Sequence, residues 1–118
     1  MHFFYRVTEA KHWIAAQKTG FFASPDLLIT GFIHASPPQQ VLVTAGLYFA
    51  TEPEVLALEI DMDLLRALGI EVELQWREER EATFAHIFGP IPLSAVRRVL
   101  TLRSNATGQF HFNQQPAS

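Results

Sequence analysis

The chain has 118 residues, of which 48% are hydrophobic and ten are phenylalanine, so it suits one domain with one core and is too short for two. Nine Lys and Arg against twelve Asp and Glu give a formal net charge of -3, which disfavours duplex nucleic acid as a partner. The chain contains no cysteine, which excludes disulfides, zinc–thiolate sites and cysteine nucleophiles.

The segment from Met1 to Arg6 lacks the basic start and the apolar core of a signal peptide. No apolar run reaches the roughly 20 residues that a membrane helix needs. We therefore expect a cytoplasmic protein without a membrane partner. A small phosphate-bearing ligand remains compatible with the charge, because one arginine and a helix N-terminus can hold it.

The amino-terminal part of the chain is predicted to form a strand and then a helix. Phe3 to Val7 is rich in aromatic and β-branched residues, which is typical of strands. Thr8 offers an N-cap for a helix that Gly20 ends. The helix residues expected to face inward are Trp13, Ile14 and Ala16.

A second strand and a second helix are predicted next. A loop through Ser24-Pro25-Asp26 leads to a strand from Ile29 to Ala35. Ser36-Pro37-Pro38-Gln39 has the pattern of a capping box, with a proline at the first helical position. The helix that follows runs to Phe49 and is apolar on most of its surface, so we expect it to be well buried.

The carboxy-terminal half is predicted to contain mostly strands, with a short helical turn from Met62 to Leu68 that Gly69 stops. The predicted strands are Val55 to Asp61, Val72 to Trp76, Phe84 to Phe88 and Val96 to Leu102, the last entered through a turn at Ser94. The fold class is therefore α+β, a small single domain over residues 1–103 with a curved or split, mainly antiparallel sheet and two main helices. Residues 104–118 are expected to form a flexible tail.

Ionisable side chains on apolar strands are the first candidates for a site. Because successive side chains of a strand point to opposite faces, each of four predicted strands places one ionisable residue among apolar neighbours. These residues are Arg6, His34, Glu59 and His86. A cluster of the four would resemble a functional site more than a solvated surface.

His34 lies in the segment Gly31-Phe32-Ile33-His34-Ala35-Ser36, which we take as the functional centre. It is either a core histidine with both ring nitrogens satisfied or a site residue beside a helix N-terminus, whose free N–H groups suit an anion. Ser36 fits a helix cap better than a nucleophile, since no GxSxG elbow surrounds it.

Arg6 and His86 each have a structural and a functional interpretation. An arginine inside an apolar strand must pair or reach water, since an unpaired buried charge is costly. Arg6 therefore either pairs with Glu59 or Glu73, or its planar fork grips a phosphate or carboxylate ligand. His86 and His34 together are a weak metal-site candidate, because no third ligand lies near either in the sequence.

Taken together, these motifs resemble the bacterial family catalogued as domain of unknown function 952. Its members have a helix that contains Trp and is capped by Thr, and then carry the motif GFIH followed by a small residue and Ser. After that come a helix that starts with Gln, a strand similar to LEID, a segment that contains Trp, and a segment that begins with FPH and ends in YGP. The matches span roughly residues 2 to 102 and are Thr8, Trp13, Gly31-Phe32-Ile33-His34-Ala35-Ser36, Gln40, Leu58-Glu59-Ile60-Asp61, Trp76 and Phe84-Ala85-His86-Ile87-Phe88-Gly89-Pro90.

The resemblance implies an ADP-ribosyltransferase-like fold with a split, curved sheet and a cleft. Enzymes of that wider fold hold NAD, use an Arg or His on the first strand, and use a later Glu to orient the ribose; fold analogy alone assigns no activity. Arg6 stands where the family usually has His, Phe88 replaces a Tyr, and Ala35 replaces a frequent Cys. The candidates for the later Glu are Glu59, Glu79 and Glu81.

The leading prediction is a site for NAD or a related nucleotide in a glycosyl- or ADP-ribosyl-type transferase. The expected catalytic residues are His34, Arg6 and His86, and the expected cofactor-binding residues are Ser36, Arg6 and Tyr5. No metal is assigned. The alternative is a non-catalytic binding or scaffold module in which the same polar residues form a buried structural network.

Overall fold

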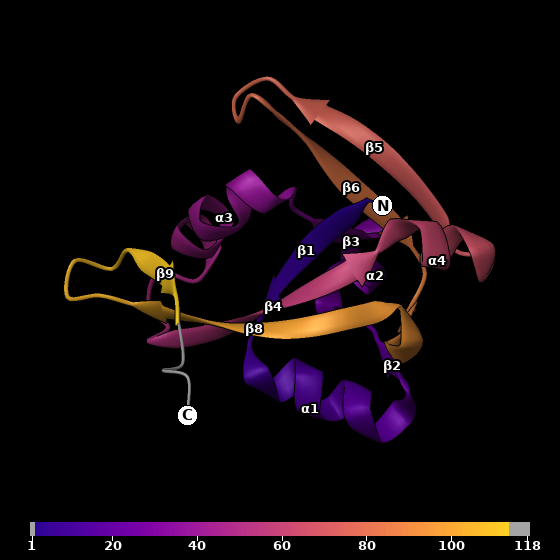
Figure 1. The fold of residues 1–118 in the computed structure, drawn as a ribbon, viewed down its shortest axis with the longest axis horizontal. Coiled ribbons are helices and arrows are strands. Elements are labelled where there is room, and N and C mark those ends of the chain that lie inside the picture. Colours follow the sequence, from indigo (N-terminus) through magenta and orange to yellow (C-terminus); the bar gives the residue numbers. More distant parts are fainter. Residues whose placement is uncertain (1, 114–118) are drawn as a thin grey trace.

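Residues 2–113, which the computed structural model describes, contain three antiparallel sheets with helices around them (Figure 1). The strands are β1 (Phe3–Thr8), β2 (Phe21–Phe22), β3 (Ile33–Ala35), β4 (Glu54–Asp61), β5 (Glu71–Arg77), β6 (Ala82–Phe88), β7 (Ile91–Pro92), β8 (Val96–Ser104) and β9 (Phe110–Phe112). The helices are α1 (Ala10–Thr19), α2 (Pro25–Thr30), α3 (Val41–Tyr48) and α4 (Met62–Ala67), with 3-10 turns η1 (Pro38–Gln40) and η2 (Leu93–Ala95). No helix within residues 2–113 is long and apolar enough to span a membrane.

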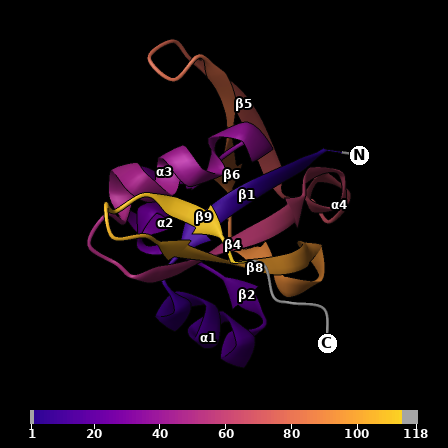
Figure 2. The ribbon, with the colours of Figure 1, turned by 60° about the vertical axis from the view of Figure 1, so that its left-hand side comes forward.

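The four-stranded sheet, of order β1-β4-β8-β9, lies between α1 and α3 (Figures 1 and 2). Alternation along β4 divides its apolar side chains between the two faces. Leu58 belongs to the buried cluster that includes Ala16 of α1, whereas Ala57 belongs to the cluster that includes Ala45 of α3. The sheet therefore carries a core on each side.

The three-stranded sheet, of order β3-β6-β5, is joined to the larger one at a backbone bridge between Tyr5 and Ser36. The N–H groups of Tyr5 and Ser36 each donate to the other residue's carbonyl oxygen, both at 2.7 Å. From this junction the β5–β6 hairpin extends away from the larger sheet (Figure 1). The predicted small α+β domain with a curled antiparallel sheet is confirmed, and its ADP-ribosyltransferase-like character stays a prediction.

The elements predicted from strong apolar patterns are confirmed with small changes at their ends. These are β1, α1, β4, α4, β5, β6 and β8, with the 3-10 turn η2 immediately before β8. Gly20 closes α1 with a φ of 88°, as expected of a glycine at that position. Asp61 caps α4, because its side chain accepts a hydrogen bond from the N–H of Leu64 at 3.1 Å.

The predicted strand from Ile29 to Ala35 is wrong in its first half. Residues Pro25–Thr30 form α2, with Ser24 as the N-cap residue, and only Ile33–Ala35 are extended. Gly31, at a φ of 89°, ends the helix and turns the chain into β3. The short helix places Asp26 in its first turn, beside β3.

Both predicted helix caps are wrong. Thr8 is the last residue of β1, and its hydroxyl donates to the carbonyl of Glu9 instead of capping α1. Ser36 is held by the backbone bridge to β1, and its hydroxyl lies 2.8 Å from that of Thr44. Strand pairing thus takes both residues away from the helix ends. In their place Glu9 and Pro37 precede the helical turns, with no side-chain cap bond.

The second predicted helix is less buried than its apolar sequence suggests. In α3 only Val41 and Ala45 are buried, one turn apart, and Leu47 is 58% exposed. In α1, Ala16 is buried as expected, but Ile14 is 53% exposed. Each of the two helices packs on the four-stranded sheet through one narrow stripe of buried residues, and its apolar residues outside that stripe are exposed to solvent.

The chain is ordered beyond residue 103, where a flexible tail was expected. Strand β9 pairs with β8, and Phe110 is buried against the α3 side of the sheet. Asn113 continues this pairing by donating to the carbonyl of Thr101 at 2.8 Å. The rest of the expected tail, residues 114–118, lies outside the described residues.

Gly31→Ala is expected to lower the free energy of unfolding by about 1 kcal/mol, since an alanine in the left-handed conformation is strained. No atom lies within 4 Å of the added methyl, so the backbone alone causes the loss. Gly46→Ala is the control: its methyl also meets nothing within 4 Å, but its backbone is helical, so we expect a gain of about 0.5–1 kcal/mol. Urea denaturation that moved both variants in the same direction would contradict this account.

Candidate functional site

A pocket of about 290 Å³ lies where β1, α2, β3, α3 and the β5–β6 hairpin meet. It is lined by Tyr5, Arg6, Val7, Asp26, His34, Ser36, Thr44, Tyr48, Phe49, Arg77, Arg80 and Phe84. The lining contains three arginines and one aspartate, whereas the chain as a whole has a formal net charge of -3. Positive charge is therefore concentrated at this pocket.

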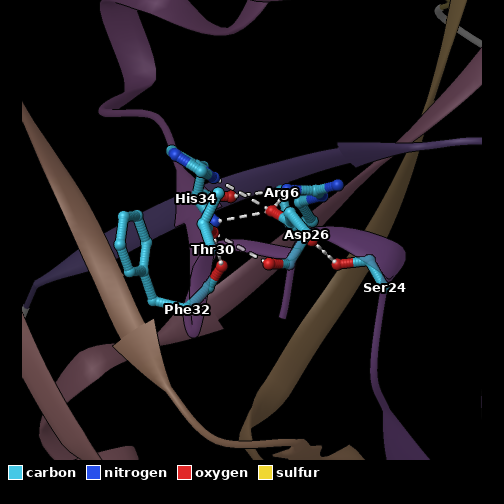
Figure 3. A network of polar contacts seen from close by, with 6 residues as sticks. All are labelled: Arg6, Ser24, Asp26, Thr30, Phe32 and His34. Atoms are coloured by element: carbon cyan, nitrogen blue, oxygen red, sulfur yellow. Dashed lines mark hydrogen bonds and ion pairs between the residues drawn. The ribbon is translucent and has the colours of Figure 1, made fainter. Parts of the chain in front are cut away.

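Asp26 is the centre of a polar network at one wall of the pocket (Figure 3). Its Oδ2 accepts from Nη1 of Arg6 at 2.6 Å and from the backbone N–H of His34 at 3.0 Å, and it lies 3.0 Å from Nδ1 of the same histidine. Its Oδ1 accepts from the hydroxyl of Ser24. Arg6 also donates to the carbonyl of His34 at 3.1 Å, so the network ties β1, α2 and β3 together.

The environment of Asp26 keeps it ionised. Burial alone raises the pKa of its carboxyl group, but the His34 ring, the charge of Arg6, the Ser24 hydroxyl and the His34 backbone N–H together outweigh burial. The pKa of Asp26 therefore lies well below its ordinary value. At neutral pH the carboxylate is a fixed anion that orients both Arg6 and His34.

The contact with Asp26 sets the tautomer of His34. In the neutral ring Nδ1 carries the proton that bonds to the carboxylate, which leaves Nε2 as the unprotonated nitrogen. Figure 3 shows the second ring nitrogen pointing away from Asp26. The side chain is 43% exposed and lines the pocket. An imidazole held in this way can take up or release a proton at Nε2.

His86 lies next to His34 but does not line the pocket. The two residues face each other across β3 and β6, with ring centroids 5.4 Å apart, and the Phe32 ring stacks on His86 at 4.1 Å. Burial, and then the charge of His34, lower the pKa of His86. No group of three or more metal-binding side chains occurs in residues 2–113, so the two histidines have no third ligand there.

The predicted ion pair between Arg6 and Glu59 or Glu73 is wrong. The partner of Arg6 is Asp26, which the sequence placed in a loop. In the register of β1 and β4, Glu59 lies opposite Tyr5, so its side chain is on the other face of the sheet from Arg6. The four ionisable residues singled out on the strands therefore do not form one cluster.

None of the three glutamates proposed as the later Glu lines the pocket. Glu59 accepts from the Tyr5 hydroxyl at 2.7 Å and pairs with Arg98 at 2.8 Å; the Arg98 bonds lower the pKa of its carboxyl group against the effect of burial. Glu79 pairs with Arg77 at the exposed hairpin. Glu81 is exposed in the same turn, with a φ of 49°.

Ser36 lies in the pocket lining as part of a chain of polar contacts that reaches the hairpin. Its hydroxyl contacts that of Thr44, which accepts from Nη2 of Arg80 at 2.7 Å. Nε of Arg80 donates to Oε1 of Gln40 at 3.0 Å, and the guanidinium lies 4.7 Å from the centroid of the Phe84 ring. Arg80 is thus held over the pocket from two sides.

The structure brings together Tyr5, Arg6, His34 and Ser36 in the pocket lining and leaves His86 beside it. The sequence did not identify Asp26, Thr44, Arg77 or Arg80. The serine–proline pair before Asp26, with the glycine five residues after it, is a start-and-stop signal that would have found α2. No local pattern marks Arg80, whose place depends on how the hairpin folds over α3.

The comparisons with known proteins identify a family and one solved relative. The family model described as "Protein of unknown function (DUF952)" matches residues 7–99. The crystal structure of protein CC0527 from Caulobacter crescentus has a TM-score of 0.80 at 27% identity, covering 92% of this chain and 93% of that one. The crystal structure of a CC0527 double mutant has a TM-score of 0.80 at 26% identity, with the same coverage of both chains. The solution NMR structure of CC0527 has a TM-score of 0.71 at 29% identity, covering 92% of this chain and 91% of that one. No curated protein matches the chain.

Proposed function

The chain belongs to the DUF952 family, as its motifs predicted, and we propose that its pocket binds a small anionic ligand of the nucleotide class. In this proposal His34 is the acid–base residue of the site. The observation that carries it is the 3.0 Å contact between Nδ1 of His34 and Oδ2 of Asp26, which leaves Nε2 available at a pocket rich in arginine. Carboxylate-oriented imidazoles of this kind serve in proton transfer.

Charge, aromatic surface and volume support the ligand class. The net positive charge of the lining favours a phosphate or carboxylate, and the rings of Tyr48 and Phe49 in the lining offer faces on which a base can stack. A volume of about 290 Å³ is near the lower end of the usual roughly 300–1,000 Å³, which favours a mononucleotide over intact NAD.

The reaction class that we propose is glycosyl transfer, from the resemblance to ADP-ribosyltransferase-like enzymes. Nε2 of His34 takes the proton of an attacking hydroxyl as the oxygen bonds to the anomeric carbon of the ribose. The bond from that carbon to the leaving group breaks, and the leaving group keeps the electron pair. Asp26 stabilises the imidazolium that forms, and Arg6 is a positioning residue that holds Asp26.

Thermal shift measurements with adenosine monophosphate, ADP-ribose and NAD at millimolar concentration test this proposal. A ligand present at about 100 times its Kd adds roughly 2.7 kcal/mol to the free energy of unfolding, which raises Tm by roughly 10 °C in a chain of this size. We expect the mononucleotide to give the largest shift for its size. The absence of a shift with all three would contradict the proposal.

The alternative is a non-catalytic binding or scaffold module, and one observation favours it. The side chains of Arg6 and Asp26 are only 16% and 17% exposed, as in a network that stabilises the junction between β1, α2 and β3. In that case His34 is part of the structure, and its removal costs about 1–3 kcal/mol because a polar partner is left unpaired. The two functions therefore differ in the stability of His34→Ala.

A further inference from the structure

We infer that Arg80 is the residue that recognises the phosphate group of the ligand, which makes the ligand a phosphate monoester of an aromatic nucleoside. This inference rests on the proposed function, because it concerns the same pocket. It concerns a different element, however, since Arg80 belongs to the β5–β6 hairpin and neither Asp26 nor His34 does.

The three pocket arginines differ in their partners. Arg6 is neutralised by Asp26 at 2.6 Å, and Arg77 pairs with Glu79. Arg80 has no carboxylate within ion-pair distance in the described part of the chain. A guanidinium without an anionic partner at a pocket is the group with most to gain from a bound anion.

Neutral groups hold Arg80 in place before any ligand binds. Gln40 accepts from its Nε and donates from Nε2 to its backbone carbonyl at 3.2 Å, so the side chain and the backbone of Arg80 are fixed together. Thr44 accepts from Nη2, and the Phe84 ring packs against the guanidinium. Within residues 2–113 these contacts engage Nε and Nη2, and Nη1 has no partner there, so Nη1 remains for a ligand oxygen.

This arrangement suits an anion that arrives with an aromatic group. Holding the guanidinium over a ring reduces the conformational entropy that binding would otherwise cost, and the acceptors on Arg80 are neutral, so they leave its charge for the ligand. Tyr48, which is 67% exposed, and Phe49 are in the pocket lining with Arg80 and His34, so rings other than the covered Phe84 can stack on a base. A base and a phosphate can therefore be recognised in one pocket of about 290 Å³ that also contains the proposed acid–base residue.

The test is isothermal titration of wild type, Arg80→Gln and Arg77→Gln with adenosine monophosphate and with adenosine. We expect wild type to bind the monophosphate at least about 10-fold more tightly, since a charge-assisted bond contributes roughly 1.5–3 kcal/mol. Arg80→Gln should remove this preference and leave adenosine binding unchanged. Arg77→Gln, on the same hairpin but paired with Glu79, should keep it.

Equal binding of the two ligands by wild type would overturn the role of Arg80 and leave the proposed pocket standing, whereas binding of neither would overturn the proposed function itself. A preference that survives Arg80→Gln, or is lost equally in Arg77→Gln, would also overturn the inference. If the Arg80→Gln variant does not fold, an NMR experiment on the wild-type protein tests the role of Arg80 instead. Titration with inorganic phosphate should then shift the Nε–H resonance of Arg80 and not that of Arg77, and the reverse pattern would overturn the inference.

Discussion

Replacing Asp26 with asparagine is expected to lower the free energy of unfolding by about 2–4 kcal/mol. The change removes the charge that balances Arg6, whose side chain is 16% exposed and cannot reach water freely. It also weakens the bonds to Nδ1 and the backbone N–H of His34, so the ring loses its orientation. Urea denaturation at neutral pH measures the loss.

Glu79→Gln is the matched control, because Glu79 also pairs with an arginine but is 61% exposed. Exposed ion pairs contribute little, so the urea midpoint of this variant should be indistinguishable from that of wild type. A loss for Asp26→Asn no larger than that for Glu79→Gln would show that burial of the Asp26 network does not stabilise the fold.

The same carboxylate should make stability depend on pH. Folding lowers the pKa of Asp26 below its ordinary value of 3.8, so the folded state favours the charged form. Its contribution is therefore complete above about pH 5 and is lost as the pH falls from about 4 toward the folded-state pKa. Wild type should lose more free energy of unfolding than Asp26→Asn between about pH 5 and pH 3, and equal losses would contradict this assignment.

His34→Ala is expected to reduce the rate of the proposed glycosyl transfer about 10²- to 10⁴-fold, which is the usual contribution of a general acid–base residue. Its effect on stability should stay below about 1 kcal/mol, because the ring is 43% exposed and Asp26 keeps its bonds to Arg6 and Ser24. Release of free base from adenosine monophosphate or NAD, followed by chromatography, measures the rate. Urea denaturation measures the stability.

His86→Ala is the control for this pair of histidines. His86 faces His34 across the strands but lies outside the pocket lining, so its removal should change the rate by less than about 10-fold. A His34→Ala protein that keeps its rate and loses about 1–3 kcal/mol of stability would instead favour the structural network. Equal rate losses in both variants would contradict the assignment of Nε2 of His34 as the proton-transfer atom.

Much of the fold could be predicted from the sequence because its long strands carry strong apolar patterns. The apolar run from Val55 to Asp61 predicted a strand that the structure places at Glu54–Asp61, and Gly69 marked the end of the short helix that follows. Helix α2 was missed because six residues are too few to show a helical period. Strand β9 was missed because the polar composition around it hides a pairing that β8 supplies.

The candidate site could be predicted only in part, because tertiary contacts decide most of it. His34 and Ser36 were found from one motif, and both line the pocket. Arg6 was found with the wrong partner, since the register of β1 and β4 that turns Glu59 to the opposite face cannot be read from the sequence. Arg80 depends on the hairpin meeting α3, a contact between residues 36 positions apart in the chain.

The most direct test of the account is an NMR titration of the ¹⁵N-labelled protein with adenosine monophosphate. We predict that the shifts on binding cluster on backbone amides of the pocket lining and on Nε2 of His34, with smaller changes at Nδ1, which Asp26 holds. Another hollow, which lies between α3 and β9 and is lined by Leu47 and Phe110, should not respond. No shift at millimolar ligand, or shifts confined to that second hollow, would contradict the assignment of the Asp26–His34 pocket as the functional site.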